Sequence, residues 1–176
     1  MPHQLSDYST GLLELNSYLN SLYDNLDICM KGLKGHEYDD VKKMHSGYTS
    51  ALRNNYKSLN SSVSEMDKII KGFEKKAKAA AEKGRQIDQT TAQAADQKIA
   101  KYHQSLRAAY ANLYTYLDPS LDITGIVGGI YTKLGVGAGK FKDGVKILKK
   151  YYLEPEEIAE ITKNVKKIKR QREKTA

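Results

Sequence analysis

The sequence predicts an all-α protein, and three observations support this fold class. The chain of 176 residues contains 3 Pro, 2 Phe and no Trp, a composition that does not suit a β protein with many turns. Leu, Ile, Val and Phe make up only about 21% of the chain, which leaves a thin core. Apolar residues recur at spacings of three and four over most of the first 80 positions. We expect an elongated, coiled-coil-like antiparallel helical hairpin with a long second arm, then a Gly-rich segment and C-terminal helices.

The first helix of this hairpin is predicted from residue 5 to about residue 31. Its apolar residues repeat every 3.5 residues, which forms a narrow seam for another helix. Two glycines then stop the helix in Lys31-Gly32-Leu33-Lys34-Gly35, because glycine accepts a positive φ. We assign the turn motif to Leu33 and Gly35. The partner seam consists of Leu12, Leu15, Leu19, Leu22 and Leu26.

The second arm begins near Tyr38 and offers two alternatives beyond Ala80. Gly84 or the cluster from Asp88 to Thr91 breaks the helix, since Asp and Thr cap a new N-terminus well; otherwise the arm runs unbroken to Leu117. Residues 1–40 carry 2 basic and 7 acidic side chains, whereas residues 41–118 carry 14 and 7. Antiparallel arms of this composition attract one another.

The clearest boundary in the chain is Asp118-Pro119, because proline disfavours helical geometry in the residue before it. We divide the chain there into a hairpin domain (1–118), a Gly-rich apolar segment (119–144) and C-terminal basic amphipathic helices (145–176). Pro155 and four nearby glutamates mark the start of the last helix, and its basic end suits the helix dipole.

The sequence contains no set of residues that suits catalysis or metal binding. The four histidines do not follow a zinc-binding spacing, and the single cysteine, Cys29, excludes an intramolecular disulfide. We therefore predict no catalytic residues, no cofactor and no metal. Nucleic acid is not an expected partner either, because few aromatic residues accompany the terminal basic cluster and no DNA-binding signature is present.

Glycines at i, i+4 spacing in the Gly-rich segment suggest a candidate membrane segment. This spacing lets two helices approach closely in lipid, and lysines that suit anionic headgroups follow. The uncharged run is too short to cross a bilayer as one helix, so a flexible linker is the competing interpretation. The glycines concerned are Gly125, Gly129, Gly135 and Gly139.

The heptad hairpin with its Leu33-Lys34-Gly35 turn resembles the type VII secretion substrates of Gram-positive bacteria, in the form of LXG domains and WxG-type hairpins. The resemblance covers about residues 5–118, and it rests on the Leu-x-Gly form because the chain has no Trp. Such substrates often carry a Tyr-x-x-x-Asp/Glu export signal after the second helix. Tyr114 and Asp118 match it just before Pro119, and the same spacing recurs at Tyr23–Asp27 and Tyr152–Glu156.

The resemblance implies a non-enzymatic secreted effector or its companion, with the hairpin as targeting and partner-binding module. It implies synthesis in the cytoplasm, then secretion or cell-surface display without a classical signal peptide. The expected partners are one or two small helical proteins and the secretion machinery. Two alternatives remain open: a small membrane-active, pore-forming protein that uses the Gly-rich segment on an anionic membrane, and an intracellular coiled-coil adaptor with a basic tail.

Overall fold

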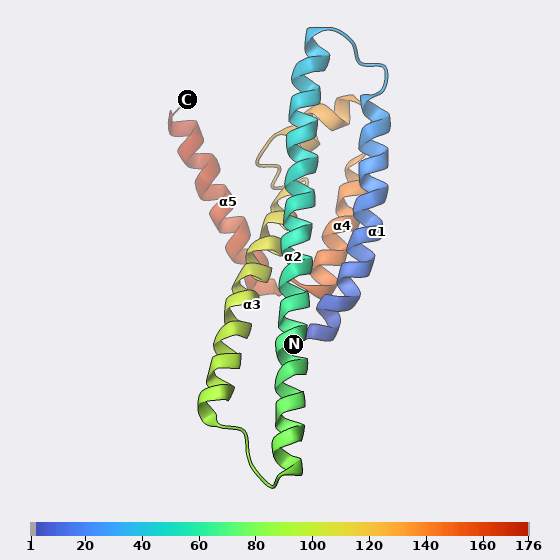
Figure 1. Ribbon diagram of the computed structural model, residues 1–176. Coiled ribbons are helices and arrows are strands. Elements are labelled where there is room, and N and C mark those ends of the chain that lie inside the picture. Colours follow the sequence, from blue (N-terminus) through green and yellow to red (C-terminus); the bar gives the residue numbers. More distant parts are fainter. Residues whose placement is uncertain (1–2, 176) are drawn as a thin grey trace.

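The computed structural model describes residues 3–175, which form six helices (Figure 1). No strand occurs in this range, and the predicted all-α class is confirmed. The helices are α1 (Leu5–Met30), α2 (His36–Glu82), α3 (Gln89–Leu117), the short π-helix η1 (Ile126–Tyr131), α4 (Ala138–Tyr151) and α5 (Pro155–Thr175).

Helices α1 to α4 form a four-helix bundle. α1 packs on α2 and α4, and α3 packs on the same two helices. The α2–α3 pair makes the most extensive contact and the α1–α4 pair the next. Successive bundle helices run antiparallel, whereas α5 lies outside the bundle and contacts α3 (Figure 1).

The second arm of the predicted hairpin is broken, so the first of the two alternatives holds. α2 ends at Glu82, Gly84 takes a φ of +69°, and the chain reverses before Asp88. Asp88 is the N-cap of α3, and its Oδ1 accepts a hydrogen bond from the Thr90 amide at 3.3 Å. The long second arm therefore folds back on itself as α2 and α3.

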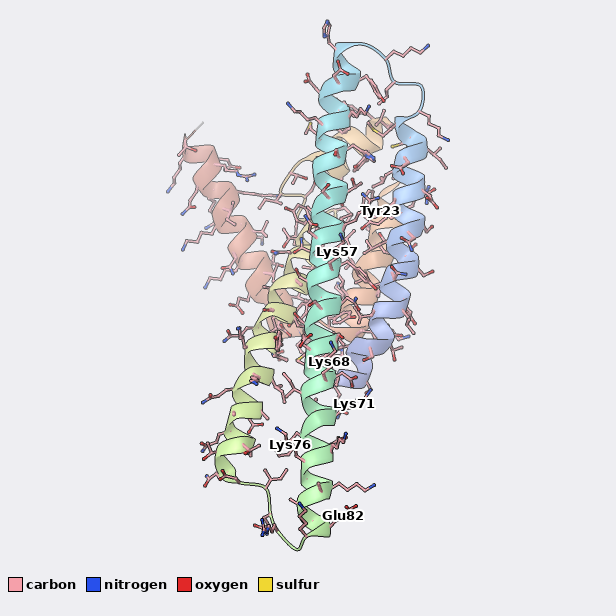
Figure 2. The ribbon with its side chains drawn as sticks, in the orientation of Figure 1. Tyr23, Lys57, Lys68, Lys71, Lys76 and Glu82 are labelled. Atoms are coloured by element: carbon pink, nitrogen blue, oxygen red, sulfur yellow. The ribbon has the colours of Figure 1, made fainter. Side chains whose placement is uncertain are left out.

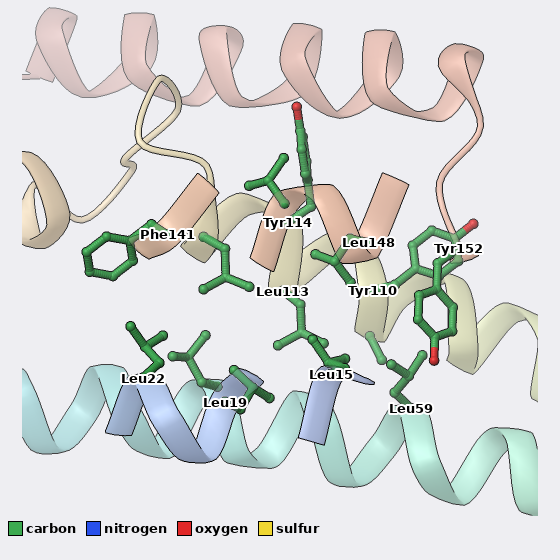
Figure 3. Close-up of a cluster of buried hydrophobic side chains, with 14 of the residues drawn as sticks. Leu15, Leu19, Leu22, Leu59, Tyr110, Leu113, Tyr114, Phe141, Leu148 and Tyr152 are labelled. Atoms are coloured by element: carbon green, nitrogen blue, oxygen red, sulfur yellow. The ribbon is translucent and has the colours of Figure 1, made fainter. Parts of the chain in front are cut away.

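The bundle core combines leucines with buried tyrosines (Figure 3). The tyrosine hydroxyls find acceptors inside the fold: Tyr48 donates to the Tyr116 carbonyl at 2.7 Å, and Tyr152 donates to the Tyr8 carbonyl at 2.8 Å. Because the hydroxyls are satisfied, the rings supply apolar area that the few Leu, Ile, Val and Phe residues do not.

The core does not extend along the whole of α2 and α3. The last buried residue of α2 is Met66, and the first buried residue of α3 is Leu106. None of the residues described between 67 and 105 is buried. This α2–α3 arm, defined here as residues 67–105, projects beyond the other helices of the bundle (Figure 1).

Two glycines let α1 and α4 approach closely. A Cβ placed on Gly144 of α4 would lie 2.7 Å from Cζ of Tyr18, and one on Gly11 of α1 would lie 2.7 Å from Cβ of Tyr151. Tyr18 is fixed in this contact because its hydroxyl donates to the Lys140 carbonyl at 2.7 Å. The close contact at positions 11 and 144 is thus possible only because glycine has no side chain.

The side chain of Asp122 stabilises the segment between α3 and α4 through hydrogen bonds to backbone amides. Its carboxylate accepts hydrogen bonds from the amides of Val127 at 3.2 Å and Gly128 at 2.7 Å, both in the first half of η1. Val127 and Tyr131 of η1 are buried in the bundle. The Gly-rich segment is therefore part of the packed structure, and the predicted boundary at residue 144 lies inside α4.

α5 is attached at its first turn and at two points farther along the helix. Glu157 accepts a hydrogen bond from the Tyr110 hydroxyl and pairs with Arg107 Nε at 3.3 Å. Glu154, just before the helix, pairs with His3 Nδ1 at 2.8 Å. Val165 is the one buried residue among the described residues of α5, and Arg172 near the end of the helix donates a hydrogen bond to the Ile123 carbonyl at 2.9 Å.

Candidate functional site

The α2–α3 arm contains an open apolar groove between its two helices. The cavity has a volume of about 450 Å³. Its floor is formed by Ile69, Phe73 and small residues of α3, among them Ala94 and Ala95, and its rim carries Lys68, Lys76 and Lys98. Neither Ile69 nor Phe73 is buried, because no other helix covers this part of the pair. The groove is thus an uncovered continuation of the bundle core.

The groove has a basic rim. Lys68 pairs with Glu65 at 3.4 Å on the same helix, whereas no acidic side chain of the described residues lies within 4.0 Å of the Lys76 or Lys98 ammonium. No Asp or Glu lines the cavity. Figure 2 shows Lys76 on the part of α2 that extends past the start of α1, and Lys68 level with that start. An apolar floor with a cationic rim complements an amphipathic helix whose polar edge is acidic.

The predicted turn motif lies between α1 and α2 and has the backbone that its glycines suggest. Gly35 is the N-cap residue of α2 with a φ of +83°, a conformation that strongly favours glycine. Leu33 is half-buried and lines a second cavity, of about 470 Å³, together with residues of α2, of η1 and of the turn after it. The remaining lining residues are Lys34, Tyr38, Asp40, Val41, Ile130, Lys133 and Leu134.

The predicted partner seam is covered within the chain itself. Leu15, Leu19, Leu22 and Leu26 are buried, and Leu12 is half-buried. In Figure 3 the labelled seam leucines point toward Phe141 and Leu148 of α4. The strongest contact of α1 is therefore with α4, a helix that lies more than a hundred residues away in the sequence.

The export-like pair lies in the last turn of α3. Tyr114 is buried and points toward α5 in Figure 3. Burial and a hydrogen bond to Asp118 raise the pKa of the Tyr114 hydroxyl. Burial acts to raise the pKa of Asp118 as well, but hydrogen bonds from Ser120 and Tyr114 outweigh it and hold that pKa below its usual value. The structure thus joins Tyr114 and Asp118 and places the tyrosine inside the fold.

The four glycines of the candidate membrane segment occupy different backbone environments. Gly125 and Gly135 have φ values of +70° and +94° at turns, whereas Gly129 and Gly139 lie in η1 and α4. A Cβ at any of the four would meet no atom within 4 Å. The close approach that glycine permits occurs instead at Gly11 and Gly144. None of the helices between residues 3 and 175 has the length and apolar character that crossing a bilayer requires.

One polar cluster in the structure is not predicted by the sequence. His45 Nδ1 lies 3.0 Å from the Tyr131 hydroxyl, and His45 Nε2 lies 3.0 Å from Oδ1 of Asp27. The cluster joins α2, η1 and α1, and no spacing in the sequence relates these three positions. Burial, with the charges of Cys29 and Asp27, raises the pKa of Tyr131.

Comparison of the chain with family models, with curated proteins and with solved structures finds no match. Within residues 3–175, no group of three or more His, Cys, Asp or Glu side chains is arranged to hold a metal ion. The arrangement of the described residues best defines the molecule as a helical bundle with one projecting two-helix arm, which carries an open apolar groove at residues 68–98.

Proposed function

We propose that this chain is a non-enzymatic interaction protein of the type VII secretion substrate kind, which binds a small helical partner in the groove of its α2–α3 arm. The observation that supports this best is the uncovered apolar floor under Lys76 and Lys98, where the bundle supplies no third helix. The expected partner contributes an amphipathic helix with Leu or Ile along one face and Asp or Glu beside it. Such a helix would pack on the arm as its third helix and extend the core of the bundle.

The resemblance to LXG and WxG-type hairpins supplies the biological setting of the proposal. It supports synthesis in the cytoplasm and export without a classical signal peptide, together with one or two helical partner proteins. The Leu33–Gly35 turn supports it too, because it lies between the first two helices as the resemblance expects. The Tyr114–Asp118 pair lies at the end of the third helix, α3, directly before Pro119. Because the seam of α1 is covered within the chain, we place the proposed partner surface on the arm and not on Leu12–Leu26.

Charge reversal at the rim tests the partner site. We expect Lys76→Glu with Lys98→Glu to weaken binding of the small helical proteins encoded beside this chain by about tenfold or more, because the rim would then repel an acidic helix. Lys75→Glu with Lys101→Glu is the matched control: it makes the same charge change on exposed positions of the same helices outside the groove. Affinity is measured by titration calorimetry, after light scattering has identified the neighbour that forms a complex. Equal weakening by both double variants, or no complex with any neighbour, would contradict the proposal.

The export role of Tyr114 and Asp118 requires variants that keep the volume of a buried ring. We expect Tyr114→Phe with Asp118→Asn to abolish export, while losing only one or two hydrogen bonds and hence about 2–5 °C of Tm. Secretion into the medium and thermal unfolding are measured on the same variant. Tyr152→Phe with Glu156→Gln alters a second copy of the same spacing and should leave export intact. Export of the Tyr114/Asp118 variant at the normal level would refute the assignment.

A further inference from the structure

α5 carries a continuous basic stripe on one face. Lys163, Lys166, Lys167, Arg170 and Lys174 follow the spacing i, i+3, i+4, i+7 and i+11, and all five side chains are exposed. The stripe is about 16 Å long at a rise of 1.5 Å per residue. None of the acidic residues described lies within 4.0 Å of these five groups. The stripe is therefore an unneutralised row of cations.

The opposite face of α5 is apolar and only partly covered. Val165 is buried, Ile158 and Ile161 are half-buried, and Ile168 is 40% exposed. The anchoring contacts of Glu154 and Glu157 all lie at the first turn, and beyond it a shallow cavity separates part of this face from α3. α5 is thus amphipathic, and its second half presents both cations and an exposed isoleucine.

We infer that α5 binds the surface of an anionic lipid membrane through this stripe. Lipid headgroups offer a plane of negative charge that all five cations of a straight helix can reach together, while the apolar face of α5 stays turned toward α3. Duplex nucleic acid matches these observations less well, because no aromatic side chain lies among the cations of the stripe. The inference is independent of the proposed partner site, since the groove and the stripe share no residue.

Vesicle binding of the full chain tests the inference. We expect the protein to bind phosphatidylcholine vesicles that contain phosphatidylglycerol and not to bind pure phosphatidylcholine vesicles. Added salt should release the bound protein. Replacing all five stripe residues by Gln should lower the affinity at least about 100-fold, given the contribution of each cation near an anionic surface. Circular dichroism then verifies that the variant retains its helices.

A second five-residue variant distinguishes the effect of the stripe on vesicle binding from the effect of total net charge. Lys42, Lys43, Lys57, Lys75 and Lys78 are exposed on α2, and their replacement by Gln removes the same total charge. This control should bind vesicles like the unaltered chain. Equal loss in both variants, or tighter binding to a short DNA duplex than to the vesicles at the same salt, would overturn the inference.

Discussion

Leu19→Asp is expected to unfold the bundle, with a loss of about 5 kcal/mol or more in the free energy of unfolding. Leu19 is 2% exposed and lies under α4, so the substitution removes a packed side chain and buries a charge without a partner. The loss is comparable with the whole stability of many domains. Thermal unfolding followed by circular dichroism measures it directly.

Leu13 provides the control on the same helix. Its side chain is 76% exposed, and Leu13→Asp introduces the same charge. We expect its free energy of unfolding to change by no more than about 0.5 kcal/mol. If the two variants unfolded at the same temperature, the inference that α1 packs against α4 through its leucine seam would be wrong.

Gly144→Ala is expected to lower stability by about 1–3 kcal/mol, or about 3–10 °C in Tm. In most helix interiors this exchange is stabilising, because alanine restricts the unfolded chain and has the higher helix propensity. At position 144 the added methyl meets the ring of Tyr18, which its hydrogen bond to Lys140 holds in place. The steric effect should exceed the propensity gain and push α4 away from α1.

Gly139→Ala is the matched control for Gly144→Ala, because it lies on the same helix with no atom within 4 Å of the new Cβ. We expect it to leave Tm unchanged or to raise it. Combining Gly144→Ala with Tyr18→Leu should show a coupling of opposite sign to the single losses, since the shorter side chain relieves the contact. Additive effects in this double-mutant cycle would count against a direct contact between the two positions.

The ends of the helices could be predicted because local chemistry determines them. Gly32 and Gly35 take positive φ after α1, Asp88 caps α3, Pro119 follows the end of α3, and Pro155 begins α5. Each of these depends on the conformational range of one residue or on one hydrogen bond to a nearby amide. For the same reason the sequence alone predicts Asp88 as a candidate cap.

The pairing of helices could not be predicted in the same way. A seam of leucines on α1 indicates that a helix covers it but not which one, and α4 and α2 both present apolar faces. The choice depends on Gly144 and Gly11, whose role is visible only once Tyr18 and Tyr151 lie against them. Likewise the groove at Phe73 exists because α1 begins only beyond the arm, a relation between distant parts of the chain.

The uneven burial along α2 divides one continuous helix between two units that resist hydrogen exchange differently. Amides near Leu52 and Leu59 open only when the bundle unfolds, whereas amides of residues 67–82 lie among half-exposed side chains and open locally at a lower free-energy cost. A ligand seated on the arm would stabilise it by mass action and slow exchange there first. The arm therefore serves as an internal reporter: protection confined to residues 67–105 identifies a groove ligand, and protection spread through the bundle identifies a different mode of binding.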